Sequence, residues 1–308
     1  MAREYQLIID SCCELPREFW DRPDITMLHF TYQDGDESHV DDLFESITAH
    51  EFYETIRKGA TPSTSQPSQA EFEEAFTTPL EEGKDAVYLA FSSGISGAYE
   101  GACVAQERVL QQHRDKGNVY VVDLKIGSTP QSLLIAEAIR HKDRGLNAEE
   151  LVAWAEEARY FVQTIFMVDD LDALRRGGRI PAGVAYAGAK LDVKPLLSFD
   201  IDGKLTMVGI ARGRKKGLRA MADFYKKAHD EHGVALVGIG NADCPRDGER
   251  MSELVKDIDK SAIFLNTNIG TTIGCHVGPG MVSCCFWGSD RRENLSVSDR
   301  IARKIKNS

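Results

Sequence analysis

Residues 87–113 have the sequence VYLAFSSGISGAYEGACVAQERVLQQH. The first six of them, Val87–Ser92, form an apolar run that predicts a buried strand. Small residues follow, and then a pattern typical of a helix. Residues 5–10 (YQLIID) and Val119–Asp123 (VYVVD) are similar short runs, each followed by a polar or glycine-containing turn. Strands that alternate with helices indicate βαβ units, so an N-terminal α/β domain with a mostly parallel sheet flanked by helices is predicted.

The second half of the sequence has a different pattern. Asp202-Gly203 lies between two apolar runs, and this dipeptide is a strong signal for a β-hairpin. Further short runs and two helical patterns, at Lys215–His229 and Arg246–Ile258, predict an α+β domain with a largely antiparallel sheet. We place the boundary near residue 160, which divides the chain into domains of residues 1–160 and 161–308.

Composition excludes several classes of function. The net charge of −11 argues against nucleic-acid binding and against docking on an anionic membrane. No apolar run is long enough to span a membrane, and the apolar part of the N-terminus is too short for a signal peptide. The seven cysteines form no CxxC pair, so we expect reduced thiols and a cytoplasmic protein. Cys12 and Cys13 are interpreted as small buried residues rather than as redox groups.

The sequence contains none of the common cofactor motifs. It has no phosphate-binding GxxxxGK[ST] segment, and Gly238-Ile239-Gly240 lacks the third glycine of a dinucleotide fingerprint. It also has no GxSxG nucleophile elbow. We therefore expect no cofactor and no metal.

Four loops carry candidate functional residues. The first, residues 61–68 (TPSTSQPS), precedes a predicted helix; N-capping accounts for Ser68 but not for Thr64 and Ser65. The second contains Ser92 and Ser93 and is either a tight turn or a backbone cradle for an anion. The third is a Gly/Pro loop that holds His276, a candidate for a polar ligand contact. The fourth contains three arginines that are either solvated or part of a docking surface: Arg175, Arg176 and Arg179.

Taken together, these segments resemble the DegV family. The resemblance rests on Asp10-Ser11 with Leu15-Pro16, TSQPS at 64–68, FSSGISGAY at 91–99, LRRGGRI at 174–180, VKPLL at 193–197 and HVGPG at 276–280. It covers nearly the whole chain in the family's order. Two segments depart from the family's usual sequence, DSCCELP at 10–16 and DLKIGSTPQS at 123–132, so the resemblance does not specify a preferred acyl chain.

The resemblance implies a two-domain protein that binds a long-chain fatty acid between its domains and is not itself an enzyme. It would present the acyl carboxylate to a separate fatty acid kinase, which forms an acyl phosphate. The carboxylate-binding residues implied are Thr64, Ser65, Ser92 or Ser93, Arg212 and His276. The same resemblance favours docking of the kinase at Arg175, Arg176 and Arg179.

Two alternatives remain at this point. The first is a serine-dependent lipid hydrolase or acyltransferase that uses Ser93 or Ser65 with His276, which requires an oriented Ser–His pair and an oxyanion hole. The second is a regulatory lipid sensor, which would share the pocket and differ from a carrier only in its partner.

Overall fold

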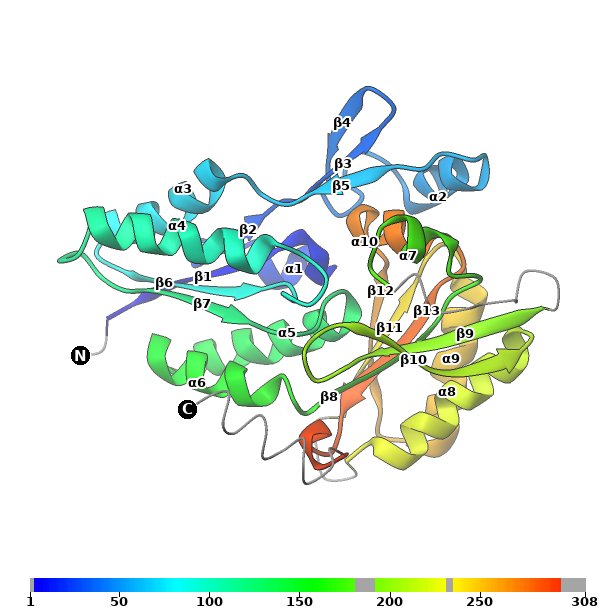
Figure 1. Ribbon diagram of the computed structural model, residues 1–308. Coiled ribbons are helices and arrows are strands. Elements are labelled where there is room, and N and C mark those ends of the chain that lie inside the picture. Colours follow the sequence, from blue (N-terminus) through cyan, green and yellow to red (C-terminus); the bar gives the residue numbers. More distant parts are fainter. Residues whose placement is uncertain (1–2, 181–191, 231–234, 295–308) are drawn as a thin grey trace.

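The computed structural model describes residues 3–180, 192–230 and 235–294. The chain forms two large sheets that lie side by side, with helices on their faces (Figure 1). The first sheet has four parallel strands in the order β2-β1-β6-β7. These strands are β1 (Tyr5–Asp10), β2 (Ile25–Leu28), β6 (Asp85–Ala90) and β7 (Val119–Asp123). The mostly parallel N-terminal sheet predicted from the sequence is confirmed.

Four helices cover the parallel sheet. Figure 1 shows α3 (Gln69–Glu81) and α4 (Ala98–Gln112) on one face, and α5 (Thr129–Asp143) and α6 (Ala148–Ala158) on the other. Ser68 caps α3 in a capping box with Glu71, as its position before the helix predicted. The short helices η1 (Ser11–Cys13) and α1 (Arg17–Trp20) follow β1.

The second sheet has six strands in the order β10-β9-β8-β13-β11-β12. They are β8 (Val162–Met167), β9 (Val193–Phe199), β10 (Leu205–Arg212), β11 (Leu236–Asn241), β12 (Ile263–Asn268) and β13 (Val282–Trp287). All its pairings are antiparallel except that of β11 with β12, so the largely antiparallel sheet is confirmed. Helices α8 (Arg214–Ala228) and α9 (Pro245–Ile258) pack on it, and α7 (Asp172–Arg176) and η3 (Arg291–Asn294) are short.

The predicted hairpin is present between β9 and β10. Its turn contains Gly203 at a φ of 82°, a backbone conformation that L residues rarely adopt. A Cβ atom at Gly203 would also lie 2.2 Å from the Ser92 hydroxyl oxygen. The hairpin turn is therefore in close contact with the loop that follows β6.

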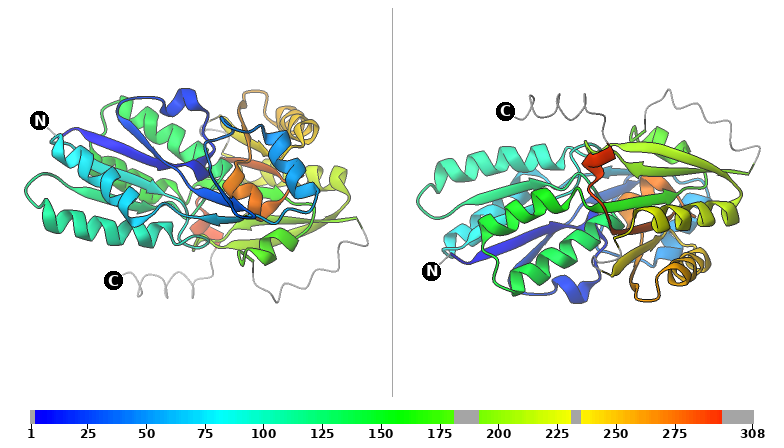
Figure 2. Two further views of the ribbon diagram at one scale, coloured as in Figure 1. Left: turned by 90° about the horizontal axis from the view of Figure 1, so that it is seen from above. Right: turned by 90° about the horizontal axis from the view of Figure 1, so that it is seen from below.

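A third, small sheet was not predicted. It consists of β3 (Thr31–Asp34), β4 (Glu37–Val40) and β5 (Ser63–Ser65), all antiparallel. Helix α10 (Thr271–Val277) lies beside it, as Figure 2 shows, and also contacts α2 (Ala49–Arg57). His276 is therefore in the last turn of a helix, and the expectation that a Gly/Pro loop holds it was wrong; the loop begins only at Gly278.

Helix α5 is buried along most of its length. All residues from Thr129 to Ile139 are buried, because the helix contacts β8, β11 and β13 as well as the η1 segment. Gln131 donates to the Asp10 carboxylate, and Thr129 accepts from Ser283 at 2.9 Å. The first turn of α5 is thus bonded to both large sheets.

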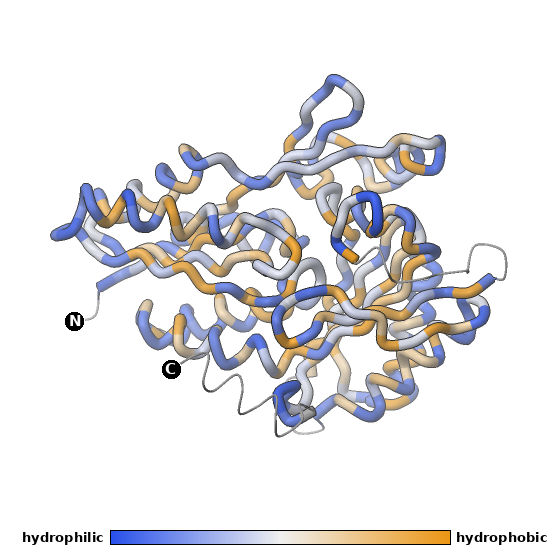
Figure 3. The backbone as a smooth tube through the Cα atoms, in the orientation of Figure 1, coloured by the Kyte–Doolittle hydropathy of each residue, from blue (hydrophilic) through white to orange (hydrophobic). Residues whose placement is uncertain are grey.

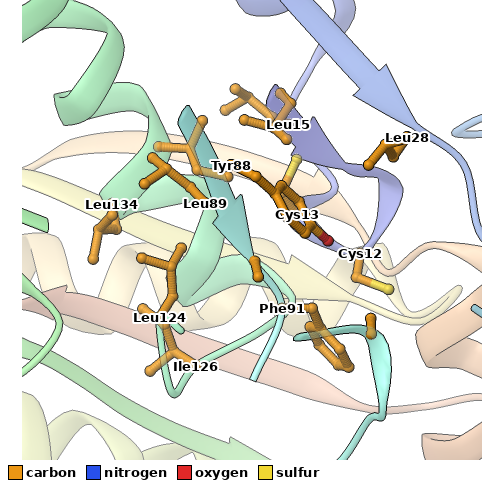
Figure 4. Close-up of a cluster of buried hydrophobic side chains, with 14 of the residues drawn as sticks. Cys12, Cys13, Leu15, Leu28, Tyr88, Leu89, Phe91, Leu124, Ile126 and Leu134 are labelled. Carbon is orange, nitrogen blue, oxygen red and sulfur yellow. The ribbon is translucent and has the colours of Figure 1, made fainter. Parts of the chain in front are cut away.

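Apolar residues are concentrated in the strands and in the contact region between the sheets, as Figure 3 shows. Cys12 and Cys13 are fully buried beside Leu15 and Tyr88 (Figure 4), which confirms that they are core residues. One continuous cluster of buried side chains includes residues of both large sheets. The division at residue 160 stays a prediction. The last strand of the parallel sheet, β7, ends at Asp123, and the first strand of the six-stranded sheet, β8, begins at Val162. No helix in the described ranges is both long and apolar enough to cross a membrane.

Glu14 and Asp41 are buried carboxyl groups at the start of α10. Glu14 accepts hydrogen bonds from the Gly270 amide at 3.0 Å and the Ser128 hydroxyl at 2.8 Å, and Asp41 accepts from the Thr272 amide at 3.1 Å. Burial raises the pKa of Glu14 from 4.5 to about 8; the two hydrogen bonds oppose this shift and the charge of Asp41 adds to it. Glu14 therefore keeps its proton in the folded protein over a range in which the unfolded chain loses it.

We predict that replacing Glu14 by glutamine changes how stability depends on pH. Because the folded-state pKa is raised, the contribution of Glu14 is fully present below pH 4.5 and is lost as the pH rises through about 8. Glutamine cannot ionise. The free energy of unfolding of Glu14→Gln, relative to that of the wild type, should therefore rise by about 1–4 kcal/mol between pH 5 and pH 8. Urea unfolding at several pH values measures this difference. A difference that stays constant with pH would contradict the prediction.

Candidate functional site

A cavity of about 340 Å³, a size typical of small-molecule pockets, is lined by strands of the six-stranded sheet and by the loops that follow strands of the parallel sheet. Its walls are mostly apolar. The aromatic side chains are Phe30, Phe91, Phe166 and Phe199, and the aliphatic ones are Ile95, Leu174, Leu205, Ile273, Val277 and Met281. Phe30 and Phe91 pack edge to face with their ring centroids 6.0 Å apart. Gly127 lies directly against the Phe91 ring, where any Cβ atom would clash.

Polar side chains gather at one part of the cavity. The Thr64 hydroxyl of β5 and Nε2 of His276 in α10 are 2.8 Å apart, so the small sheet and α10 are joined at this point. Ser65, Ser96 and Arg179 also line the cavity. Thr64, Ser65 and His276, all predicted site residues, are therefore brought together by the fold.

His276 is largely buried at the polar part of the cavity. Its Nδ1 atom is buried and has no hydrogen-bond partner within the part of the chain that the structure describes. The absence of a side chain at Gly177 leaves room for the imidazole, because a Cβ atom at this residue would lie 2.3 Å from Nδ1 of His276. Burial lowers the pKa of His276 from 6.5 to about 4, and the nearby charge of Arg179 adds to the effect. The imidazole is thus neutral near pH 7.

Arg179 is the cation of the cavity's polar part. Its Nε atom donates to the Ile95 carbonyl at 3.2 Å, and Nη1 donates to the Gly177 carbonyl. It forms no ion pair with any described acidic residue, and burial lowers its pKa. Arg175 and Arg176, in contrast, are exposed. The three arginines of the LRRGGRI segment therefore do not share one environment, and only Arg179 lines the cavity.

Ser92 and Ser93 make contacts within the protein. Ser92 is fully buried and donates to the Gly203 carbonyl at 2.8 Å, which ties the loop after β6 to the hairpin turn. Ser93 donates to Asp123 at 2.6 Å, and its amide donates to the same carboxylate. Neither serine is among the residues that line the cavity, whereas Ser96 of the same loop is.

Arg212 is placed away from the cavity. It is the last residue of β10, where it is exposed and borders a small apolar groove with Val193 and Ile210. The neighbouring Arg214 is the structural arginine of this segment, because it pairs with Asp169 and Asp247. Of these arginines, it is Arg179 and not Arg212 that lines the cavity.

The geometry does not provide the Ser–His pair that the hydrolase alternative requires. Nε2 of His276 contacts Thr64, not Ser65 or Ser93, and Nδ1 has no carboxylate to orient it among the described residues. Within the same ranges, no group of three or more His, Cys, Asp or Glu side chains is placed to hold a metal ion. An apolar cavity with several hydroxyl groups and a cation, Arg179, that has no acidic partner among the described residues suits an amphipathic ligand with an acidic head.

The comparisons with known proteins agree with this class of site. A family model described as "Uncharacterised protein, DegV family" matches residues 4–288, and the chain belongs to the DegV family. It is 31% identical over 289 residues to a DegV domain-containing protein of Clostridium perfringens, covering 94% of this chain and 99% of that one.

Two solved structures of fatty-acid-binding proteins are similar to this chain. One is a stearic-acid-binding protein from Eubacterium ventriosum, with 28% identity and a TM-score of 0.81 over 94% of this chain and all of that chain. The other is DegV, a fatty acid binding protein from Bacillus subtilis, with 26% identity and a TM-score of 0.78 over 94% of this chain and all of that chain.

We predict that Gly177→Ala disturbs the polar cluster through His276. The φ of Gly177 is −70°, so alanine fits the backbone, but its methyl group would overlap the imidazole. Overpacking of this kind costs about 1–3 kcal/mol. The expected result is a lower free energy of unfolding together with a shifted His276 ring signal in NMR spectra.

Gly209→Ala is the matched control, because a Cβ atom there would meet Leu196 at an ordinary 3.6 Å. It should change stability by less than about 0.5 kcal/mol. If both variants leave the His276 signal and the stability unchanged, Gly177 does not position the imidazole.

Proposed function

We propose that this protein binds one long-chain fatty acid in the cavity, between its two domains. The observation that carries the proposal is the pairing of apolar walls with a half-buried arginine, Arg179, that has no acidic partner among the described residues. The similar protein from Eubacterium ventriosum binds stearic acid, and DegV from Bacillus subtilis is a fatty acid binding protein. The mostly apolar cavity of about 340 Å³ in this chain supports the proposal of such a ligand.

The two ends of a fatty acid would be bound by different forces. Each buried methylene contributes ~0.8 kcal/mol, so a sixteen-carbon tail gains roughly 12 kcal/mol before the costs of ordering and of lost translation. Burial of the tail therefore supplies most of the affinity. The carboxylate would accept hydrogen bonds from Arg179, Thr64 and Ser65 or Ser96, since a buried charge without partners is expensive.

We further propose that the carboxylate is presented to a fatty acid kinase, which forms the acyl phosphate. Ser65 is exposed, so the polar end of the cavity adjoins the surface where a partner can approach. Arg175 and Arg176 are exposed in α7, three to four residues before Arg179, and would pair with acidic groups of the kinase. The protein would then act as a carrier in the cytoplasm rather than as the catalyst.

The proposal predicts which arginine matters for fatty-acid binding. The purified protein should release about one fatty acid per chain on extraction, as measured by mass spectrometry. Arg179→Gln should weaken binding of added stearate by at least tenfold, because it removes a charged hydrogen-bond donor. Arg212→Gln is the matched control and should change affinity by less than twofold, because Arg212 lies outside the cavity lining. No lipid on extraction and no uptake of stearate would overturn the proposed function.

Kinase docking predicts a separate effect. In Arg175→Glu with Arg176→Glu, the fatty-acid content should stay unchanged while acyl phosphorylation by a fatty acid kinase falls several-fold, most strongly at low salt. Lys226→Glu with Lys227→Glu reverses two exposed charges in the last turn of α8 and serves as the control. Equal phosphorylation of the two double variants would exclude this docking surface.

A further inference from the structure

One hydroxyl group in the cavity lies away from the polar cluster. Thr164 is on β8, is only 2% exposed and lines the cavity, yet its Oγ1 atom has no hydrogen-bond partner in the described part of the chain. The residue opposite it in the sheet is Cys285, whose thiol is close enough to interact with the Thr164 hydroxyl but is only a weak hydrogen-bond partner. A buried polar atom without a partner is costly, so such atoms in cavities commonly meet a ligand or a water molecule.

The sheet register gives the position of this hydroxyl along β8. Strand β8 runs from Thr164 to Met167, and the chain then continues to α7 and Arg179. Strand β13 follows the helix that contains His276, and it begins opposite Met167. Thr164 is three residues from that end of the strand, which corresponds to about 10 Å. A chain whose carboxylate lies at Arg179 would therefore pass Thr164 with its middle or distal carbons.

Thr272 also lines the cavity and its Oγ1 atom has no hydrogen-bond partner in the described chain, but this residue lies against the buried Asp41 carboxyl group. Two further cavity hydroxyls have partners within the protein. Ser283 accepts from the Gly240 amide at 3.1 Å and donates to Thr129 at 2.9 Å. Ser128 donates to Glu14. Their hydrogen bonds are used within the protein, whereas the proton of the Thr164 hydroxyl is still available to a ligand oxygen.

We propose that the cavity accommodates an oxygenated fatty acid, with a hydroxyl on the middle or distal part of the chain bonded to Thr164. This inference rests on the proposed function, because it assumes that the carboxylate lies at Arg179 and His276. In an entirely apolar pocket a chain hydroxyl is penalised, since it loses its water without gaining a partner. Thr164 removes that penalty for one range of hydroxyl positions.

The test compares stearic acid with a series of hydroxystearic acids, which carry the hydroxyl next to the carboxylate, at mid-chain or near the methyl end. For the wild type, at least one mid-chain or distal isomer should bind as tightly as stearic acid. Thr164→Val keeps the β-branched shape and should leave stearic acid binding unchanged, or tighter, while weakening that isomer about tenfold. Thr164→Ser keeps the hydroxyl and should preserve the wild-type preference.

Two contrary results are distinguishable. If the wild type binds stearic acid but binds every mid-chain and distal isomer at least tenfold more weakly, and Thr164→Val does not change these ratios, this inference is overturned while the proposed function stands. If the wild type does not bind stearic acid at all, the proposed function fails, and this inference fails with it.

Discussion

The burial of α5 between the two large sheets is the constraint on which the cavity depends. A helix that is buried on all sides needs hydrogen-bond partners for the polar groups near its start, and several groups of the first turn of α5 find partners from both sheets. The Ser128 amide donates to the Cys12 carbonyl, Gln131 contacts Asp10, and Thr129 bonds with Ser283. Because Ser128 and Pro130 also line the cavity, these bonds fix the distance between its two walls.

Local sequence patterns predicted the elements that are apolar and long enough to have a clear period. The strands after residues 4, 84 and 118 and the Asp202-Gly203 hairpin belong to this group. The small sheet was missed because Glu37–Val40 and Ser63–Ser65 are polar and four or three residues long, and their pairing with β3 depends on distant contacts. The helix at Thr271–Val277 was missed for a similar reason, since its amide groups are satisfied by carboxylates from elsewhere in the chain, Glu14 and Asp41.

For the site, the sequence indicated the correct loops but not the roles of all their residues. Thr64, Ser65 and His276 do line one cavity. Ser92 and Ser93 were reasonable candidates because small hydroxyl residues follow a strand, yet a turn and an aspartate far away in sequence, at Gly203 and Asp123, occupy their hydrogen bonds. The environment of Arg179 differs from that of Arg175 and Arg176 because the chain turns at Gly177-Gly178, where the φ of Gly178 is 70°. The signal was the glycine pair itself, which ends α7 and turns the third arginine inward.

The distribution of buried charge determines which way an acidic ligand would lie in this cavity. Two residues of the cavity wall near the start of α10 are hydrogen-bonded to buried carboxyl groups. Ser128 donates to Glu14, and the Thr272 amide donates to Asp41. At the other end of α10, neutral His276 lies beside Arg179, which has no acidic partner in the described chain. A carboxylate placed near Ser128 would find no cation among these groups, whereas the same group near Arg179 gains a charged donor. On the proposed function, the position of Arg179 would therefore direct the carboxylate toward Thr64 and His276 and leave the aromatic walls and Thr164 to the tail.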